Sequence, residues 1–335
     1  MSACVPKHTV SNSELLNIMP ADEVEKVIKS VGIKERRVCD TNTTASDLCY
    51  EAAKKLIEDN AIDPASIDMV LFMSQCGDYR IPATACILQH RLGLSKDCSA
   101  MDLSLGCSGY VYALSTAMAF ASNDGINRVL LLDGESFSKI VNPLDKVNLP
   151  LYGDAGTATL IEKGNFEESI FILRTDGSGK DSVKVPDGGM RNPVTEDSII
   201  VTEREDGNFR NNLQVFMDGM EVFNFAIRVV PKGVKEMLTL TQNTLDDISH
   251  IVFHQSNRFM TDFFVKKLKA EPQKIPYCID RFGNTSSASI PLTIVSELYN
   301  KKVGGVLLCG FGAGLSWGTA FVELDKCKIS ELIEI

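Results

Sequence analysis

The feature that most constrains the fold is a set of apolar segments that occurs twice along the chain. Ile67-Asp-Met-Val-Leu-Phe72 is matched in the second half by Ile248-Ser-His-Ile-Val-Phe253. The apolar run 128–133 has a weaker counterpart at 305–309, and Gly-Thr-Ala at 156–158 recurs at 318–320. Strands that are apolar throughout are buried on both faces, and here they alternate with helix-like segments. The pattern therefore predicts layered α/β structure built from two related halves.

We place the boundary between these halves at residues 164 and 165, which divides the chain into 1–164 and 165–335. The stretch 177–212 is polar, rich in glycine and carries charges of both signs. Because helical spacing of apolar residues resumes over 216–230, we interpret this stretch as an excursion with cap structure and not as a linker.

Composition excludes several classes of protein. The chain has 335 residues, of which 44% are hydrophobic and 23% charged, which indicates a globular protein with a large core. It has neither a long apolar run nor a signal peptide, so we expect no membrane association. The net charge of −10 argues against nucleic acid as a partner. The ten cysteines show no CxxC or zinc-ligand spacing, which favours a reducing cytoplasm and predicts neither a metal site nor a cofactor.

Cys107 is the first candidate for chemistry. It follows a glycine and precedes a run of small and apolar residues, 111–121, that predicts a buried helix beginning at or just after the cysteine. A thiol at a helix N-terminus faces unpaired backbone N–H groups and the positive end of the helix dipole, which favour thiolate. Buried cysteines are also common in cores, so the position alone leaves both roles open.

Two residues of the second half are candidate partners. His254 follows the apolar strand Ile251-Val-Phe253, and Asn284 lies in Gly283-Asn-Thr-Ser-Ser-Ala-Ser289 at another glycine-to-helix junction. Cysteine with histidine and asparagine is a recurring nucleophilic set, but the residue types alone do not specify the reaction.

At these motifs the chain resembles the β-ketoacyl-acyl-carrier-protein synthase III family of the thiolase superfamily. Matching segments extend over nearly the whole length and occur in one order. Besides the Cys107, His254 and Asn284 motifs they are Gly32-Ile-Lys-Glu-Arg-Arg37, Tyr152-Gly-Asp-Ala-Gly156, Met217-Asp-Gly-Met-Glu-Val-Phe223 and Gly310-Phe-Gly-Ala-Gly-Leu-Ser-Trp-Gly318. The resemblance implies a five-layer αβαβα fold made of two pseudo-symmetric halves, and a homodimer.

The resemblance also implies the reaction. Cys107 takes an acyl group from an acyl thioester, and a malonyl thioester then loses carbon dioxide and attacks the acyl-cysteine in a decarboxylative Claisen condensation. His254 and Asn284 donate hydrogen bonds to the thioester oxygen that gains charge during decarboxylation. The backbone N–H groups of Cys107 and Ala313 form the oxyanion hole, with alanine where the family usually has glycine. Asn284 is also expected to cap the helix that follows it.

Further residues receive roles only through the resemblance. Phe311, Met217 and Phe223 are candidates for the acyl pocket, and Ile81 is expected to reach the pocket of the partner subunit and to tune primer size. Arg258, Lys266 and Lys267 are candidates for docking an acidic acyl carrier protein, although Phe259 fills the position of the family's usual arginine.

Two departures from the family pattern bear on the donor and on the N-terminus. The tryptophan and arginine that clamp the adenine of coenzyme A are missing, since the single tryptophan is Trp317 and Lys146 stands where the arginine is usual. The acyl donor is therefore a thioester of either coenzyme A or a carrier protein, and the primer can be an acyl group longer than acetyl. Met1 begins almost at the family's first turn, so either the first sheet has a shortened edge or the natural start lies upstream.

Three rival functions are weighed against condensation. The first is an acyltransferase of the same fold that passes the acyl group from Cys107 to a hydroxyl or amine without decarboxylation. The second is a non-catalytic subunit, against which the intact Cys107, His254 and Asn284 argue. The third, a hydroxymethylglutaryl-coenzyme A synthase, is disfavoured by the Gly-Asn-Thr-Ser match.

Overall fold

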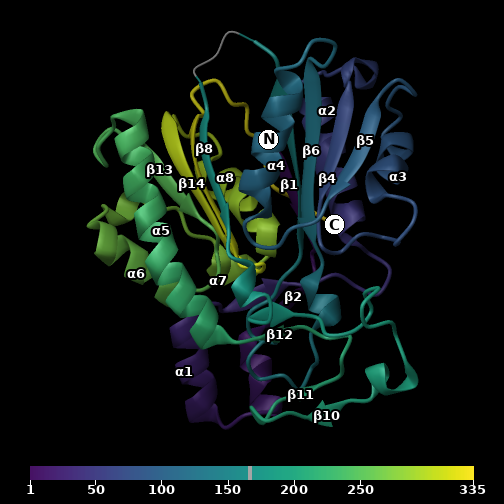
Figure 1. The fold of residues 1–335 in the computed structure, drawn as a ribbon, viewed down its shortest axis with the longest axis vertical. Coiled ribbons are helices and arrows are strands. Elements are labelled where there is room, and N and C mark those ends of the chain that lie inside the picture. Colours follow the sequence, from purple (N-terminus) through teal and green to yellow (C-terminus); the bar gives the residue numbers. More distant parts are fainter. Residues whose placement is uncertain (165–167) are drawn as a thin grey trace.

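The computed structural model describes residues 1–164 and 168–335 and contains two large sheets with helices between and outside them, besides three sheets of two short strands each (Figure 1). The first sheet has the order β16-β1-β7-β6-β4-β5 and the second the order β13-β14-β15-β8. The strands of the first are β1 (Ser2–Val5), β4 (Met69–Met73), β5 (Ser99–Leu103), β6 (Arg128–Glu135), β7 (Ala155–Glu162) and β16 (Ile333–Glu334). Those of the second are β8 (Ile170–Thr175), β13 (His250–Phe253), β14 (Gly305–Gly312) and β15 (Ser316–Glu323).

The two sheets repeat one strand pattern. β4 pairs in parallel with β6, which pairs antiparallel with β7, and β7 pairs antiparallel with β1. In the same way β13 is parallel to β14, β14 is antiparallel to β15, and β15 is antiparallel to β8. The segments that resemble each other in sequence are thus equivalent strands, and the predicted duplication is confirmed.

Helices form the three remaining layers. Helix α4 (Gly109–Ala121), the short 3-10 helix η7 (Ser286–Ala288) and helix α8 (Ser289–Leu298) lie in one core with residues of both sheets. Helices α2 (Ala45–Asp59) and α3 (Thr84–Arg91) cover the outer face of the first sheet, and α5 (Gly219–Thr241) and α6 (Arg258–Leu268) cover that of the second. The five-layer αβαβα expectation is therefore confirmed.

Side-chain alternation explains why both sheets are covered on both faces. On β4, Leu71 packs into the central core with α4 and α8, whereas Val70 and Phe72 pack outward against α2 and α3. A strand turns successive side chains to opposite faces, so an uninterrupted apolar strand needs a helix layer on each side.

Short elements form a cap at one end of the layers, at the bottom of Figure 1. They are α1 (Ala21–Val31), β2 (Thr9–Ser11), β3 (Glu35–Arg37), β9 (Val183–Lys184), β10 (Thr202–Glu203), β11 (Phe209–Arg210), β12 (Phe216–Met217) and α7 (Ile279–Phe282). The buried Arg210 pairs with Asp145 at 3.0 Å and with Asp206 at 2.6 Å, which ties the polar segment 177–212 to the first half. The interpretation of this segment as a cap is confirmed.

The division of the chain at 164 and 165 stays a prediction, because residues 165–167 lie outside the described residues. Two observations bear on the termini. β1 pairs on both of its sides, so this edge of the first sheet is present. The C-terminal strand β16 joins the first sheet and not the second, which the division into halves did not anticipate. No helix of the described residues is both long and apolar enough to span a bilayer.

Candidate active site

Cys107 lies in the turn that joins β5 to the central helix α4. The helix starts at Gly109, two residues after the cysteine, as the sequence predicted. The Gly109 N–H donates to Gly106 O at 2.7 Å, which closes the turn around Cys107.

The glycine loop at the end of β14 packs directly against the cysteine. A Cβ added to Gly312 would lie 2.7 Å from Cys107 Cβ and 3.0 Å from Sγ, and one added to Gly310 would lie 2.9 Å from Ser108 Cα. Glycine is therefore required at both positions for this close approach. The backbone of Ala313 hydrogen-bonds toward Cys107, and its methyl group occupies space beside Gly106.

His254 stands at the carboxyl end of β13 and is only 2% exposed. Its backbone N–H donates to Cys309 O at 2.8 Å, and its ring meets Phe311 edge to face at 5.3 Å between centroids. Burial lowers the pKa of His254 to about 3, so the imidazole is neutral at physiological pH.

Ser289 controls which ring nitrogen of His254 carries the proton. Ser289 Oγ donates to Ser286 O at 2.7 Å and lies 2.7 Å from His254 Nδ1, so in this arrangement it accepts from the ring and the imidazole proton is on Nδ1. If the Ser289 hydroxyl turns to donate to Nδ1 instead, the neutral ring carries its proton on Nε2, and this tautomer can donate to a substrate oxygen.

Asn284 is fixed by its backbone and by its side chain. Its N–H donates to Leu151 O at 2.7 Å, and its carbonyl accepts from Gly153 N at 3.1 Å. Its Oδ1 accepts from Ser286 N at 2.9 Å, so the side chain binds the first N–H of η7 from the position before its N-cap residue, Thr285. With Oδ1 occupied in this way, the Nδ2 amide is the group left to donate.

Ser286 is the point at which the three predicted residues meet. Its Oγ lies 3.7 Å from Cys107 Sγ, its N–H binds Asn284, and its backbone hydrogen-bonds toward the ring of His254. The structure thus brings sulfur, imidazole and carboxamide together around one serine. Sequence reasoning named Asn284 but missed Ser286, and the only signal for it was the run of hydroxyl residues between Gly283 and Ile290.

The sequence predicted that the helix N-terminus favours the thiolate of Cys107, but the pKa of this thiol is raised. Burial raises the pKa of Cys107 to about 11, hydrogen bonds from Ser286 and the Ala313 backbone oppose this, and the nearby Glu135 charge adds to it. Desolvation therefore outweighs the helix N-terminus, and the resting residue is a thiol.

The predicted pocket residues fall into two groups. Phe311 is buried against His254, and Met217 Sδ lies 4.0 Å from the hydroxyl of Tyr152, whose backbone pairs with Asn284. Phe223 on α5 instead stacks with Phe259 at 5.3 Å, and Ile81 is 87% exposed. Their roles in an acyl pocket stay predictions.

The predicted docking residues lie on α6 and face solvent. Arg258 pairs with Asp262 at 2.7 Å and covers the ring of Tyr277 at 4.7 Å, and Lys266 and Lys267 are exposed in its last turn. Phe259, in place of an arginine, is 57% exposed. Trp317 packs edge to face on Phe225 within the outer core, where it cannot clamp a donor's adenine.

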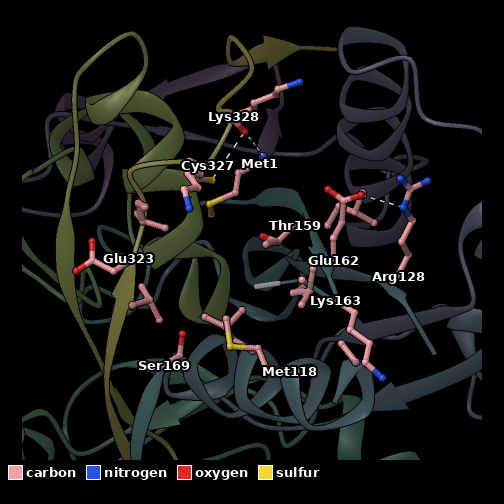
Figure 2. Close-up of a pocket in the computed structure, with 18 of the residues that line it drawn as sticks. Met1, Met118, Arg128, Thr159, Glu162, Lys163, Ser169, Glu323, Cys327 and Lys328 are labelled. Atoms are coloured by element: carbon pink, nitrogen blue, oxygen red, sulfur yellow. Dashed lines mark hydrogen bonds and ion pairs between the residues drawn. The ribbon is translucent and has the colours of Figure 1, made fainter. Parts of the chain in front are cut away.

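A cavity of about 910 Å³ opens at the far end of α4, and none of these site residues lines it. Figure 2 shows Met118, Thr159 and Cys327 around this hollow, with Arg128 and Lys163 on one side. Cys107 precedes the opposite end of the same helix, so this cavity is separate from the site. The described residues hold no group of three or more side chains suited to a metal ion.

Comparison with known proteins matches the same regions. Residues 101–177 match the family model described as 3-oxoacyl-[acyl-carrier-protein (ACP)] synthase III, and residues 238–324 match its C-terminal domain. The first region holds Cys107, and the second holds His254, Asn284 and Ala313.

Curated relatives and solved structures extend this similarity to the whole chain. A putative 3-oxoacyl-[acyl-carrier-protein] synthase 3 of Campylobacter jejuni is 36% identical over 98% of this chain and 94% of its own. A beta-ketoacyl-[acyl-carrier-protein] synthase III of Rhodopirellula baltica is 35% identical over 94% of both. The crystal structure of a 3-oxoacyl-(acyl-carrier protein) synthase from Burkholderia xenovorans is 37% identical, with a TM-score of 0.93 over 99% of this chain and 95% of that one.

Proposed function

The chain belongs to the 3-oxoacyl-[acyl-carrier-protein] synthase III family, and we propose that Cys107, His254 and Asn284 are its catalytic residues. As a condensing enzyme it acylates a cysteine from an acyl thioester and then condenses that acyl group with a malonyl thioester. The observation that carries the residue assignment is the convergence of the three side chains on Ser286.

In the first stage, Cys107 Sγ attacks the carbonyl carbon of the acyl thioester. The carbonyl oxygen becomes an oxyanion, which the N–H groups of Cys107 and Ala313 stabilise. The bond to the donor sulfur then breaks, and the thiol proton of Cys107 leaves with the released donor thiol. Covalent storage of the acyl group lets one site use two large thioesters in turn.

In the second stage, the malonyl carboxylate leaves as carbon dioxide and its electron pair forms an enolate. Once the Ser289 hydroxyl has turned to donate to His254 Nδ1, His254 Nε2–H and Asn284 Nδ2–H donate to the enolate oxygen, so they bind the transition state more tightly than the ground state. The enolate carbon attacks the acyl-cysteine, the carbon–sulfur bond breaks, and the Cys107 thiolate takes up a proton. A neutral His254 suits this role, because it donates a hydrogen bond without attracting the malonyl carboxylate.

The experiment that tests the assignment is mass spectrometry of the enzyme after exposure to a panel of acyl-coenzyme A and acyl-carrier-protein donors. We expect one acyl group per chain on the peptide that contains Cys107, and none in Cys107→Ala. Cys86→Ala is the control, because Cys86 is an exposed free thiol on α3, away from these residues, and should be dispensable. An acyl group that persists in Cys107→Ala contradicts the assignment.

For the second substrate we propose an acyl carrier protein that docks on α6. Acyl carrier proteins are acidic, and the whole chain carries a net charge of −10, so docking needs a local basic surface. Arg258, Lys266 and Lys267 supply three exposed cations on that helix, of which Arg258 is already paired with Asp262.

We further propose a homodimer in which Ile81 enters the partner's acyl pocket. The observations in support are that β5 ends the first sheet with an open edge, and that Tyr79 and Ile81 are 67% and 87% exposed. Large apolar side chains exposed together are typical of an interface. Sedimentation of the wild type and of Ile81→Glu tests this, and a monomeric wild type at micromolar concentration would contradict it.

A further inference from the structure

Two carboxyl groups are buried beneath the proposed nucleophile, and the reaction steps above do not use them. Asp133 and Glu135 lie two residues apart at the end of β6, so both side chains point to the same face of the first sheet. Both are completely buried, and within the described residues neither is hydrogen-bonded to a lysine or arginine. Buried carboxyl groups without a cation are costly and call for an explanation.

Ser287 joins the two carboxyl groups to the active site. Its Oγ lies 2.6 Å from Asp133 Oδ1 and 3.3 Å from Glu135 Oε1. The preceding residue is Ser286, which contacts Cys107 Sγ. The carboxyl pair therefore anchors the turn that meets the cysteine from one side.

Glu135 also holds the segment that meets the cysteine from the other side. Its carboxylate accepts from Ser74 Oγ at 3.2 Å and from Gln75 N at 3.1 Å. Gln75 in turn packs on Gly106, where its Oε1 would lie 3.1 Å from an added Cβ. Gly106 immediately precedes Cys107, so a single carboxylate fixes the surroundings of the sulfur through two separate segments.

The negative charge of the pair resides on Glu135. Glu135 accepts hydrogen bonds from Ser74, Gln75, Cys76 and Ser287, whereas Asp133 accepts only from Ser287 and its Oδ2 has no partner among the described residues. Burial raises the pKa of both groups, that of Glu135 to about 7. Two adjacent buried carboxyl groups do not both ionise near neutral pH, and the better hydrogen-bonded one ionises first.

Among the described residues, no other charged group acts on the pair from the elements packed against it. The remaining titratable groups around it are Cys49 of α2, Cys76 after β4, and Cys107 and Tyr110 at the start of α4. Burial raises the pKa of each, so all four are neutral near pH 7. The ionisation of Glu135 is thus the one change of charge near Cys107 in this range.

We propose that Glu135 is a positioning residue for Cys107: it holds the Gln75 and Ser287 segments on both sides of the cysteine, and its charge sets how readily the thiol ionises. This rests on Cys107 being the nucleophile. A carboxylate close to a forming thiolate disfavours it, so protonation of Glu135 makes Cys107 a stronger acid. The reactivity of Cys107 then depends on the protonation state of the buried Glu135.

The test is the rate at which iodoacetamide alkylates Cys107 in the folded enzyme between pH 5 and pH 10, followed on its peptide by mass spectrometry. Glu135→Gln keeps the size of the side chain and removes the charge. Above pH 7 we expect this variant to react about tenfold faster than the wild type, a shift of about one pH unit. Below about pH 6 the two rates should converge, because Glu135 is then protonated in the wild type. Glu162→Gln, which removes an exposed carboxylate from the far end of β7, is the matched control and should follow the wild type.

Two results would overturn the proposal. One is a Glu135→Gln profile that coincides with the wild type at every pH. The other is a profile displaced by one constant factor, also below pH 6, which would mean that the residue is only structural. If Glu135→Gln fails to fold, Glu135→Asp takes its place, because it keeps the charge and should retain an inflection near neutral pH in the plot of alkylation rate against pH. If neither Glu135→Asp nor the wild type shows that inflection, the proposal is contradicted.

Iodoacetamide needs neither an acyl donor nor a malonyl thioester, so this experiment separates two kinds of failure. A wild type that alkylates as expected but never accepts an acyl group at Cys107 would refute the proposed function. An acylating wild type without the pH-dependent difference would refute the role of Glu135.

Discussion

Asn284 combines two roles, cap and catalytic donor, and a pair of matched variants can separate them. Its Oδ1 accepts from Ser286 N at 2.9 Å, and Asn257 Oδ1 accepts from Met260 N at 2.8 Å as the cap of α6. Each amide oxygen accepts one backbone N–H at a helix start, although Asn257 is the N-cap of α6 and Asn284 precedes Thr285, the N-cap of η7; only Asn284 shares Ser286 with Cys107 and His254. We compare Asn284→Ala with Asn257→Ala.

The expected magnitudes follow from what each variant loses. Loss of a capping hydrogen bond costs about 0.5–2 kcal/mol of stability, so each variant should be destabilised by an amount within this range. Loss of a donor to a developing oxyanion costs about 3–4 kcal/mol of barrier, which is roughly 100- to 1000-fold in rate. Asn284→Ala alone should show this loss in decarboxylation.

Denaturant unfolding measures the first effect, and release of labelled carbon dioxide from a malonyl thioester by the pre-acylated enzyme measures the second. If Asn284→Ala decarboxylates within about threefold of Asn257→Ala, the residue is only a cap and the reasoning fails.

Three further predictions follow from the same site. The pKa of His254 is lowered from 6.5 to about 3, so between pH 6.5 and pH 5 the unfolded state takes up a proton that the folded state does not, and the wild type should lose about 2 kcal/mol of stability by pH 5. In denaturant unfolding, His254→Gln should lack this contribution to the slope of unfolding free energy against pH, and equal slopes in the two proteins would contradict the neutral histidine. Gly312→Ala places a methyl group 3.0 Å from Cys107 Sγ and should slow acylation by roughly 100-fold in a stopped-flow assay, whereas an unchanged rate would show that the loop can move away. Lys266→Glu with Lys267→Glu should raise KM for malonyl-carrier protein while leaving KM for malonyl-coenzyme A unchanged, and equal effects on both would exclude carrier docking at this pair.

Much of the fold could be predicted from the sequence, because its signals are local. The segments around Ile67 and Ile248 are apolar on both faces, and this requires a helix layer on each side of their sheets. The repeat of these segments then places the start of α4 and the start of η7 at equivalent points. Cys107 and Asn284 precede those two starts, and His254 ends a strand of the second sheet, which is why all three were identified.

The remainder of the site depends on tertiary contacts that the sequence does not display. Glu135 has no distinctive neighbours in the sequence and Ser286 is one of several hydroxyl residues in its run, and both act through contacts with residues far along the chain. The raised pKa of Cys107 has the same origin, since desolvation by the Gly310–Gly312 loop and η7 outweighs the helix terminus that the sequence does predict. The C-terminal strand β16 was missed because two residues in a strand leave no periodicity to read.

The most direct test of the proposed division of roles uses one variant to separate acylation of Cys107 from decarboxylation of the malonyl thioester. His254→Ala is exposed first to an acyl donor and then to a malonyl thioester, with acylation followed by intact mass and decarboxylation by carbon dioxide release. We predict that Cys107 still gains its acyl group within about tenfold of the wild-type rate, while decarboxylation falls by roughly 100-fold or more. Equal losses in both steps would contradict the proposed division of roles between the sulfur and its two donors.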